Sequence, residues 1–240
     1  SNREFANVLS ELLGELNASH TGGRYRPDRK PGDTRTASLG VFFDRSHNGD
    51  GFRIAEIINN GPLDRAEYKL QPGDVITHID GEQLTRAVNI HALLDGKVGD
   101  RVRLTIARDG ADPRDIVVRP VSISEETELV YQRWVRANRD MVERLSDGRI
   151  GYMHVRGMND PSFRNFYSEA LGRHFDKDAL IVDTRHNGGG WLHDDLATFL
   201  TGTRYSNLLP RKDQDPVKRY VGDSQKRWNK PSALLMNEAN

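Results

Sequence analysis

The 240-residue sequence has no cysteine, which excludes disulfide bonds, thiolate zinc sites and a cysteine nucleophile. It also has no apolar run near the roughly 18 residues that a membrane-spanning helix needs. Its 35 basic residues balance 35 acidic ones, so no net charge draws it to nucleic acid or to an anionic membrane. We therefore expect a globular piece of a longer protein, with neither nucleic acid nor a membrane as partner.

Hydrophobic spacing divides the chain into three segments. Residues 3–16 carry apolar side chains at helical spacing, whereas residues 37–120 show the short apolar runs and turn residues of strands. From residue 122 onward strands alternate with helices, which predicts a mainly parallel sheet with crossover helices. The middle segment should hold strands at 39–43, 52–58, 75–79, 101–106 and 115–119, and helices at 61–66 and 86–94. The third should hold helices at 129–145, 161–175 and 193–201, and strands at 149–155, 179–184 and 233–236.

The middle segment resembles a PDZ domain of the circularly permuted kind found in bacterial proteases. The motifs that carry the resemblance are Ser38-Leu39-Gly40-Val41-Phe42, Gly61-Pro62-Leu63, Leu70-Gln71-Pro72-Gly73-Asp74 and Ile79-Asp80-Gly81. A Leu-Gly turn leaves backbone amides free to hold a carboxylate, and the strand after it can accept a peptide as an added strand. Leu39, Gly40, Val41 and Phe42 are therefore candidate peptide-binding residues. The alternative, that Leu39 and Phe42 belong only to the core, stays open.

Ser19 and His20 form a short polar motif between the first helix and a glycine pair at 22–23. A histidine on such a flexible turn can swing its ring into a cleft, and the adjacent serine can orient the ring. The alternative interpretation is a solvated helix end without catalytic function.

A second motif follows the apolar run 179–183 and reads Asn187-Gly188-Gly189-Gly190. Consecutive glycines at the carboxyl end of a parallel strand expose backbone N–H groups that can stabilise a tetrahedral oxyanion. The loss of one such donor typically slows acyl transfer by about 10²–10³-fold. The alternative is an ordinary strand-to-helix turn that uses glycine for positive φ.

The order of these features resembles the tricorn protease family along nearly the whole chain. The features are the Ser-His turn, the PDZ-like segment and the run from Asp183 to Gly190. The resemblance implies a mixed α/β fold, in which a PDZ domain is inserted into a crotonase-like serine peptidase core. We expect residues 1–34 to form a helical piece of that core with a linker, residues 35–121 the PDZ domain, and residues 122–240 an incomplete core.

The resemblance also implies roles for individual residues. His20 would be the general base, Ser19 its hydrogen-bonded partner, and Gly188 or Gly189 the donor to the oxyanion. The family's nucleophilic serine follows the strand after the glycine loop, so we expect it beyond Asn240 and expect this chain alone to be inert. The family further implies peptide or unfolded polypeptide substrates, a cytoplasmic location, a homo-oligomer that is a hexamer for the full-length protein, and no cofactor or metal.

Two other functions remain open from the sequence alone. A carboxy-terminal processing peptidase shares the PDZ-plus-core plan but uses a Ser-Lys dyad and needs no Ser-His turn. A peptide-binding PDZ scaffold would have no activity at all. The sequence contains no phosphate-binding loop, no dinucleotide glycine motif and no His-Glu-x-x-His motif, which leaves the nucleotide and zinc-protease alternatives without support.

Overall fold

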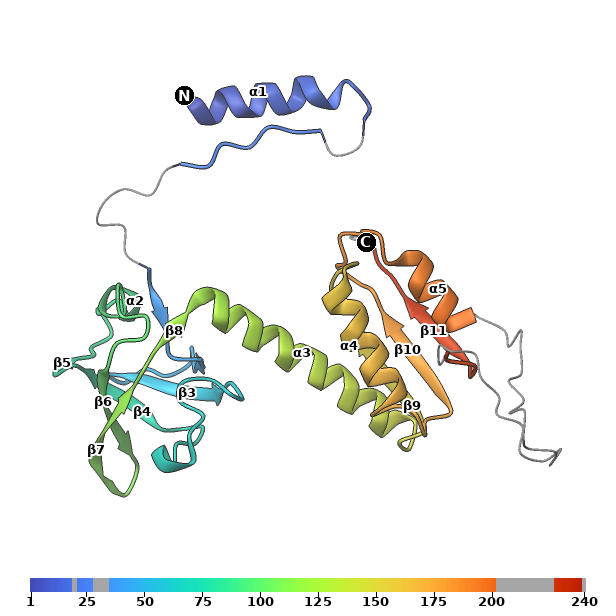
Figure 1. Ribbon diagram of the computed structural model, residues 1–240. Coiled ribbons are helices and arrows are strands. Elements are labelled where there is room, and N and C mark those ends of the chain that lie inside the picture. The colour runs from blue at the N-terminus through green and yellow to red at the C-terminus, as the bar shows by residue number, and fades with distance from the viewer. Residues whose placement is uncertain (19–20, 28–34, 202–226, 239–240) are drawn as a thin grey trace, which may run out of the picture. The chain divides into compact units, whose positions relative to one another are not determined.

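The computed structural model describes residues 1–18, 21–27, 35–201 and 227–238 (Figure 1). These residues fall into two compact units. The first unit comprises the described residues of Ser1–Leu39, Asp44–Arg53 and Gly73–Ile123. The second comprises those of Gly40–Phe43, Ile54–Pro72 and Ser124–Asn240. Each unit mixes helices and strands, as expected for a mixed α/β protein.

The chain begins with helix α1 (Asn2–Gly14). The Ser1 hydroxyl accepts a hydrogen bond from the Glu4 amide at 3.3 Å, and the Glu4 side chain returns to the Ser1 backbone, which makes a capping box. The apolar stripe of this helix stays exposed, with Phe5 at 70% and Leu12 at 64%. Because an apolar stripe needs an apolar partner, we expect this one to pack on the third segment, and that packing remains a prediction.

The first unit is built on antiparallel strands in the order β3-β4-β6-β7, with β5 paired to β4. Its core includes the buried side chains of Ile76, Ile79, Leu104 and Ile106. The strands are β4 (Val75–Ile79), β5 (Glu82–Gln83), β6 (Val102–Arg108), β7 (Ala111–Val118), the start of β3 (Phe52–Ile57), and the pair β1 (Ala37–Ser38) with β8 (Val121–Ser122).

The helix that we expected at 86–94 is shorter in the structure. Helix α2 covers only Ile90–Leu93, because the Asn89 side chain accepts a hydrogen bond from the His91 amide and starts the helix there.

The second unit opens with a hairpin formed by β2 (Val41–Phe43) and the end of β3, with Val41 opposite Ile57. The prediction of a helix at 61–66 is wrong. This stretch forms two consecutive turns, in which the Gly61 amide donates to the Ile58 carbonyl and the Asp64 amide donates to the Gly61 carbonyl. A 3₁₀ helix, η1, follows at Ala66–Tyr68.

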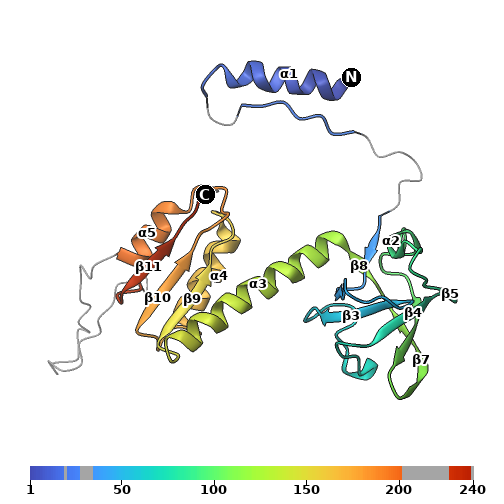
Figure 2. The ribbon, with the colours of Figure 1, turned by 180° about the vertical axis from the view of Figure 1, so that it is seen from behind.

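The rest of the second unit is a three-stranded parallel sheet with the order β11-β10-β9 (Figure 2). Met153 from β9, Val182 from β10, Phe166 from α4 and Phe199 from α5 share one core. The elements in chain order are α3 (Ile123–Leu145), β9 (Ile150–His154), α4 (Asp160–Leu171), β10 (Ala179–Asp183), α5 (His193–Thr201) and β11 (Ser232–Leu235). The expected alternation and parallel pairing are confirmed.

Side chains alternate along β9, so Tyr152 and His154 face away from Met153. His154 contacts Trp134 of α3, with ring centroids 4.9 Å apart. Helix α3 therefore covers the face of β9 opposite the core shared with α4 and α5. In the described part of the chain, none of the helices is both long enough and apolar enough to span a bilayer.

Candidate active site

The structure describes one of the two predicted catalytic motifs. Ser19 and His20 lie outside the described residues, so their roles stay predictions. Their neighbour Thr21 is described, and its hydroxyl donates hydrogen bonds to the carbonyls of Leu13 at 3.1 Å and Ala18 at 2.9 Å. The residue after the predicted pair is thus tied back to the end of α1.

The second motif forms a loop, residues 184–192, that leaves the carboxyl end of β10 and leads into α5. We call it the glycine loop. A turn closed by the Asn187 amide on the Thr184 carbonyl, 3.0 Å away, starts the loop, and His186 takes a left-handed φ of 65°. Asn187 is buried and its side-chain amide donates to the Val155 carbonyl at 2.7 Å. The loop is therefore anchored to the chain that follows β9.

The three glycines of the loop have different surroundings. The Gly189 amide donates to the Asn187 side-chain oxygen at 2.9 Å, so this N–H is already engaged. A Cβ added at Gly188 would meet nothing within 4 Å, so Gly188 borders open space. A Cβ added at Gly189 would also meet nothing within 4 Å, so it is the engagement of the Gly189 amide that favours Gly188 as the oxyanion donor. Gly190 has a φ of 141°, and a Cβ there would lie 2.5 Å from the Met158 carbonyl oxygen, which explains the third glycine.

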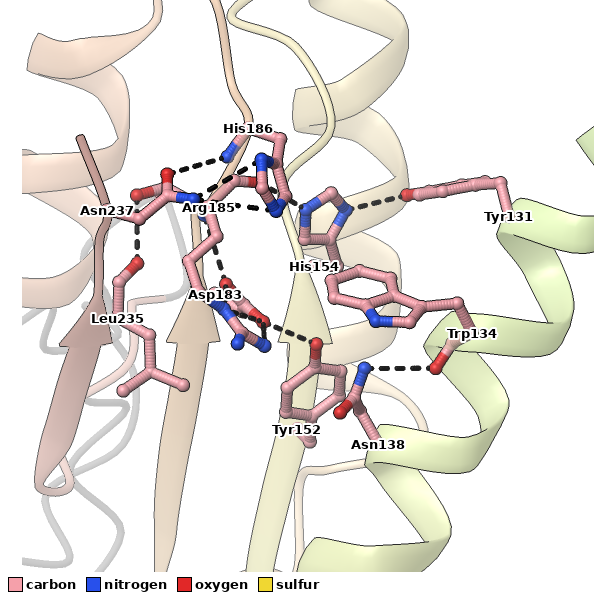
Figure 3. A network of polar contacts seen from close by, with 11 residues as sticks. Tyr131, Trp134, Asn138, Tyr152, His154, Asp183, Arg185, His186, Leu235 and Asn237 are labelled. Atoms are coloured by element: carbon pink, nitrogen blue, oxygen red, sulfur yellow. Dashed lines mark hydrogen bonds and ion pairs between the residues drawn. The ribbon is translucent and has the colours of Figure 1, made fainter. Parts of the chain in front are cut away.

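The buried carboxylate of Asp183, the last residue of β10, holds the start of the loop in place through Tyr152 and Arg185 (Figure 3). Asp183 is 0% exposed and accepts hydrogen bonds from the Tyr152 hydroxyl at 2.6 Å and from the Arg185 guanidinium at 2.9 and 2.5 Å. Burial acts to raise the pKa of Asp183, but the hydrogen bonds from Arg185 and Tyr152 outweigh burial and lower it to about 2. Burial, followed by the hydrogen bond to Asp183, raises the pKa of Tyr152. At neutral pH Asp183 and Arg185 therefore form an ion pair, and Tyr152 is neutral and donates a hydrogen bond to Asp183.

The carboxyl end of β11 lies directly beside the start of the glycine loop. Leu235 is opposite Asp183 in the parallel register, and its carbonyl accepts hydrogen bonds from the Thr184 amide at 2.9 Å and hydroxyl at 3.0 Å. The His186 amide donates to the Asn237 side chain at 3.1 Å. Residues that follow β11 thus start from the edge of the loop that holds the candidate oxyanion donor.

The comparisons with known proteins agree with this architecture. Residues 38–122 match the tricorn protease PDZ domain family, and residues 149–240 match peptidase family S41. The chain is 30% identical over 219 residues to the tricorn protease of Thermoplasma acidophilum, and this alignment covers 87% of the chain and 20% of that protein. It is 31% identical over 217 residues to the tricorn protease homolog of Saccharolobus solfataricus, with 87% and 20% covered.

The solved crystal structure of the tricorn protease superposes with a TM-score of 0.68 at 26% identity, over 94% of this chain and 22% of that one. The chain belongs to the tricorn protease family. The expected family and the mixed α/β fold class are thereby confirmed. The chain spans about a fifth of the length of the tricorn relatives that it matches.

The four predicted peptide-binding residues of this tricorn-family chain differ in exposure. Leu39 and Val41 are buried at 3% and 8%, as core residues are, while Phe42 is 39% exposed. Gly40 has a φ of 68°, and its carbonyl accepts a hydrogen bond from the Ile58 amide at 3.0 Å. β2 stands at the end of its sheet order, where β-strand addition takes place.

Sequence reasoning missed the residues that support the glycine loop. Tyr131, Tyr152 and His154 come from a helix and a strand that the sequence predicted, but their contacts join residues 23 and 31 positions apart. A weak signal was present, because Tyr131 and Trp134 are separated by three positions and so share one helix face.

Proposed function

We propose that this chain supplies part of the catalytic site of a serine peptidase that hydrolyses peptides. The observation that carries the proposal is the glycine loop. It lies at the carboxyl end of a parallel strand, within the S41-like region, and presents Gly188 to open space beside the end of β11. Backbone donors fixed in this way are suited to the charge that develops on a carbonyl oxygen during attack.

In the proposed mechanism the nucleophile is a serine that follows β11. The contacts of Leu235 and Asn237 with the glycine loop support this location, since they start the following segment at the loop's edge. His20 would take the proton from the serine hydroxyl as the new C–O bond forms, while Ser19 orients the imidazole. Gly188 would donate to the oxyanion, and His20 would return the proton to the leaving amine. Water would then hydrolyse the acyl-enzyme by the same steps.

Further parts of the proposal concern the whole protein. It would be a cytoplasmic endopeptidase that works as a homo-oligomer on peptides or unfolded polypeptides, without a cofactor. The segment Leu39–Phe42 would hold a peptide end, which is supported by the Gly40 turn and by the edge position of β2. The 240-residue chain by itself would bind peptide without turnover.

The test is to treat the full-length protein with a serine-directed phosphonate and to locate the labelled residue by mass spectrometry. We expect one labelled serine in the segment that follows β11, no labelled serine in residues 1–240, and loss of labelling in His20→Ala. Labelling that persists in His20→Ala would favour the Ser-Lys alternative. A protein that neither labels nor cleaves a panel of fluorogenic peptides would be a PDZ scaffold, and the proposal would be wrong.

A further inference from the structure

His154 is the last residue of β9 and lies opposite Asp183, the last residue of β10 (Figure 3). Its imidazole has a partner on each nitrogen. Nε2 is 2.9 Å from the backbone carbonyl oxygen of Arg185, and Nδ1 is 2.8 Å from the Tyr131 hydroxyl. The ring therefore joins helix α3 to the second residue of the glycine loop.

The two partners define the tautomer of His154. A carbonyl oxygen can only accept, so Nε2 must carry a proton and donate it to Arg185. Burial lowers the pKa of His154 and keeps the ring neutral. Nδ1 is then an acceptor, and the Tyr131 hydroxyl donates to it. The Arg185 carbonyl thus selects the tautomer, and the Tyr131 hydroxyl stabilises it by donating to Nδ1.

Aromatic contacts fix the position of the His154 ring. Trp134 meets it edge-on, with ring centroids 4.9 Å apart and planes at 90°, and Tyr131 meets it at 5.5 Å and 60°. Both aromatic residues carry an arginine on their faces: the Arg185 guanidinium carbon is 5.4 Å from the Trp134 centroid, and that of Arg156 is 4.2 Å from the Tyr131 centroid. The slot formed by Tyr131 and Trp134 leaves the ring little freedom to turn.

The peptide unit between Arg185 and His186 is consequently held from both sides. His154 binds its carbonyl oxygen at 2.9 Å, and the Asn237 side chain accepts from its N–H at 3.1 Å. This peptide plane stands two residues before Gly188, and His186 takes a left-handed φ of 65° directly after the carbonyl. The orientation of this plane therefore sets the direction in which the following amides point.

We propose that His154 is a positioning residue that orients the glycine loop, with Tyr131 stabilising the tautomer that donates to the loop. The inference rests on the proposed function, because it assigns the aimed loop to an oxyanion. His154 does not touch the reacting atoms; it acts through the Arg185 carbonyl. A flat aromatic ring of similar size without the Nε2 donor should leave most of the packing in place and let the loop move.

The experiment compares four variants of the full-length protein. His154→Phe keeps the ring against Trp134 but removes the donor, and His154→Gln restores an amide donor near the Nε2 position. Tyr131→Phe removes only the hydroxyl that donates to Nδ1. His78→Phe is the matched control, since His78 is a partly buried strand histidine of the PDZ-like segment that contacts Thr77 at 3.0 Å. Two readouts are measured: hydrogen exchange of amides 186–190, and kcat and KM on a fluorogenic peptide.

For His154→Phe we expect loop amides to exchange about tenfold faster, as for one lost hydrogen bond. We expect kcat to fall about 10–100-fold with KM within twofold, because a displaced donor affects the transition state more than substrate binding. His154→Gln should recover most of both, Tyr131→Phe should fall between, and His78→Phe should match wild type. Should His154→Phe fail to fold, the ordering of the other three variants still decides.

Wild-type exchange of the loop in His154→Phe, or an unchanged kcat in that variant, would overturn the inference. Equal losses in His154→Phe and His154→Gln would reduce His154 to a packing residue and would also overturn it. An inactive wild-type protein would instead contradict the proposed function, and in that case the exchange data alone decide whether His154 holds the loop.

Discussion

Both the PDZ-like region and the S41-like region contain a fully buried aspartate that is held by the two side-chain nitrogens of one arginine. Asp74 is paired with Arg108 at 2.5 and 2.7 Å, and Asp183 with Arg185 at 2.9 and 2.5 Å. Both aspartates are 0% exposed, and the arginine side chains are 35% and 34% exposed. The two pairs are thus nearly identical in chemistry and burial.

The pairs differ in what they connect. Asp74 and Arg108 are 34 positions apart, and their ion pair links the start of β4 to the end of β6. This pair therefore stabilises the contact between two neighbouring strands of a sheet. Asp183 and Arg185 are two positions apart, and Asp183 also binds Tyr152 of β9. This second pair fixes the path of the chain as it leaves β10. An Asp–Arg pair of the same chemistry therefore stabilises a sheet in one region and fixes the path of a loop in the other. The residues around each pair determine which of these roles it has.

The largest effect that separates the two regions should come from the proposed general base. Replacing His20 by Ala in the full-length protein should lower kcat/KM by about 10⁴-fold or more, because the members of a catalytic triad act as a unit. Peptide hydrolysis under single-turnover conditions measures it. The control is His47→Ala, which removes a partly exposed histidine from the hairpin turn of the PDZ-like region and should keep wild-type turnover. Equal activity in both variants would remove His20 from the mechanism.

The second prediction concerns the two aspartates. Asp183→Asn and Asp74→Asn should each lower the free energy of unfolding of their own region by about 3 kcal/mol. This is at the low end for a broken buried ion pair, because each arginine is about one-third exposed and can be hydrated. Only Asp183→Asn should also lower kcat, since only that pair shapes the glycine loop.

Hydrogen exchange in increasing urea measures the stability of each region separately, and steady-state kinetics measures kcat. A loss of kcat in Asp74→Asn at a temperature where the protein is fully folded would contradict the distinction between the two pairs.

The local elements were predictable because their patterns are short-ranged. The sequence predicted β4 at 75–79 and α5 at 193–201, and both bounds agree with the structure. Helix α3 starts at Ile123, earlier than the predicted 129. The prediction missed residues 123–128 because they lack an apolar stripe, but their glutamates favour a helix.

The support of the glycine loop was not predictable in the same way. It depends on the parallel register that sets Asp183 opposite His154, and on the packing of α3 against β9. Neither is encoded within one stretch of sequence. The glycine run itself identified the loop. Both Gly188 and Gly189 border open space, and only the structure shows that the Gly189 amide is already bound to the Asn187 side chain.

A third prediction separates the regions by pH. His174 is 2% exposed in the S41-like region, and burial, followed by the positive charges of Arg139, Arg173 and Lys177, lowers its pKa to about 4. In the unfolded chain His174 binds a proton near pH 6.5, whereas in the folded chain it does so only near pH 4. The free energy of unfolding is therefore highest above pH 6.5 and decreases as the pH falls toward 4. Between pH 7.5 and pH 5 the loss should be about 2 kcal/mol.

Urea unfolding of the S41-like region at several pH values measures this loss. His174→Phe should remove about 2 kcal/mol of it and leave the contribution of His154, whose pKa burial also lowers. Asp183 does not contribute in this window, because its lowered pKa of about 2 makes its stabilisation disappear only below about pH 4. An unchanged pH slope in His174→Phe would mean that another group causes the loss.

The smallest effects should come from the two glycine turns, which differ in the strain that an added side chain would introduce. Gly40→Ala should destabilise the protein by about 1–2 kcal/mol, because its φ of 68° is costly for alanine and the new Cβ would lie 2.6 Å from Cδ of Pro62. Gly188→Ala should stay within about 0.5 kcal/mol of wild type, since nothing lies within 4 Å of the added Cβ. Thermal unfolding of both variants at one pH measures the difference. A Gly188→Ala variant destabilised as much as Gly40→Ala would mean that Gly188 faces protein instead of the open space an oxyanion requires.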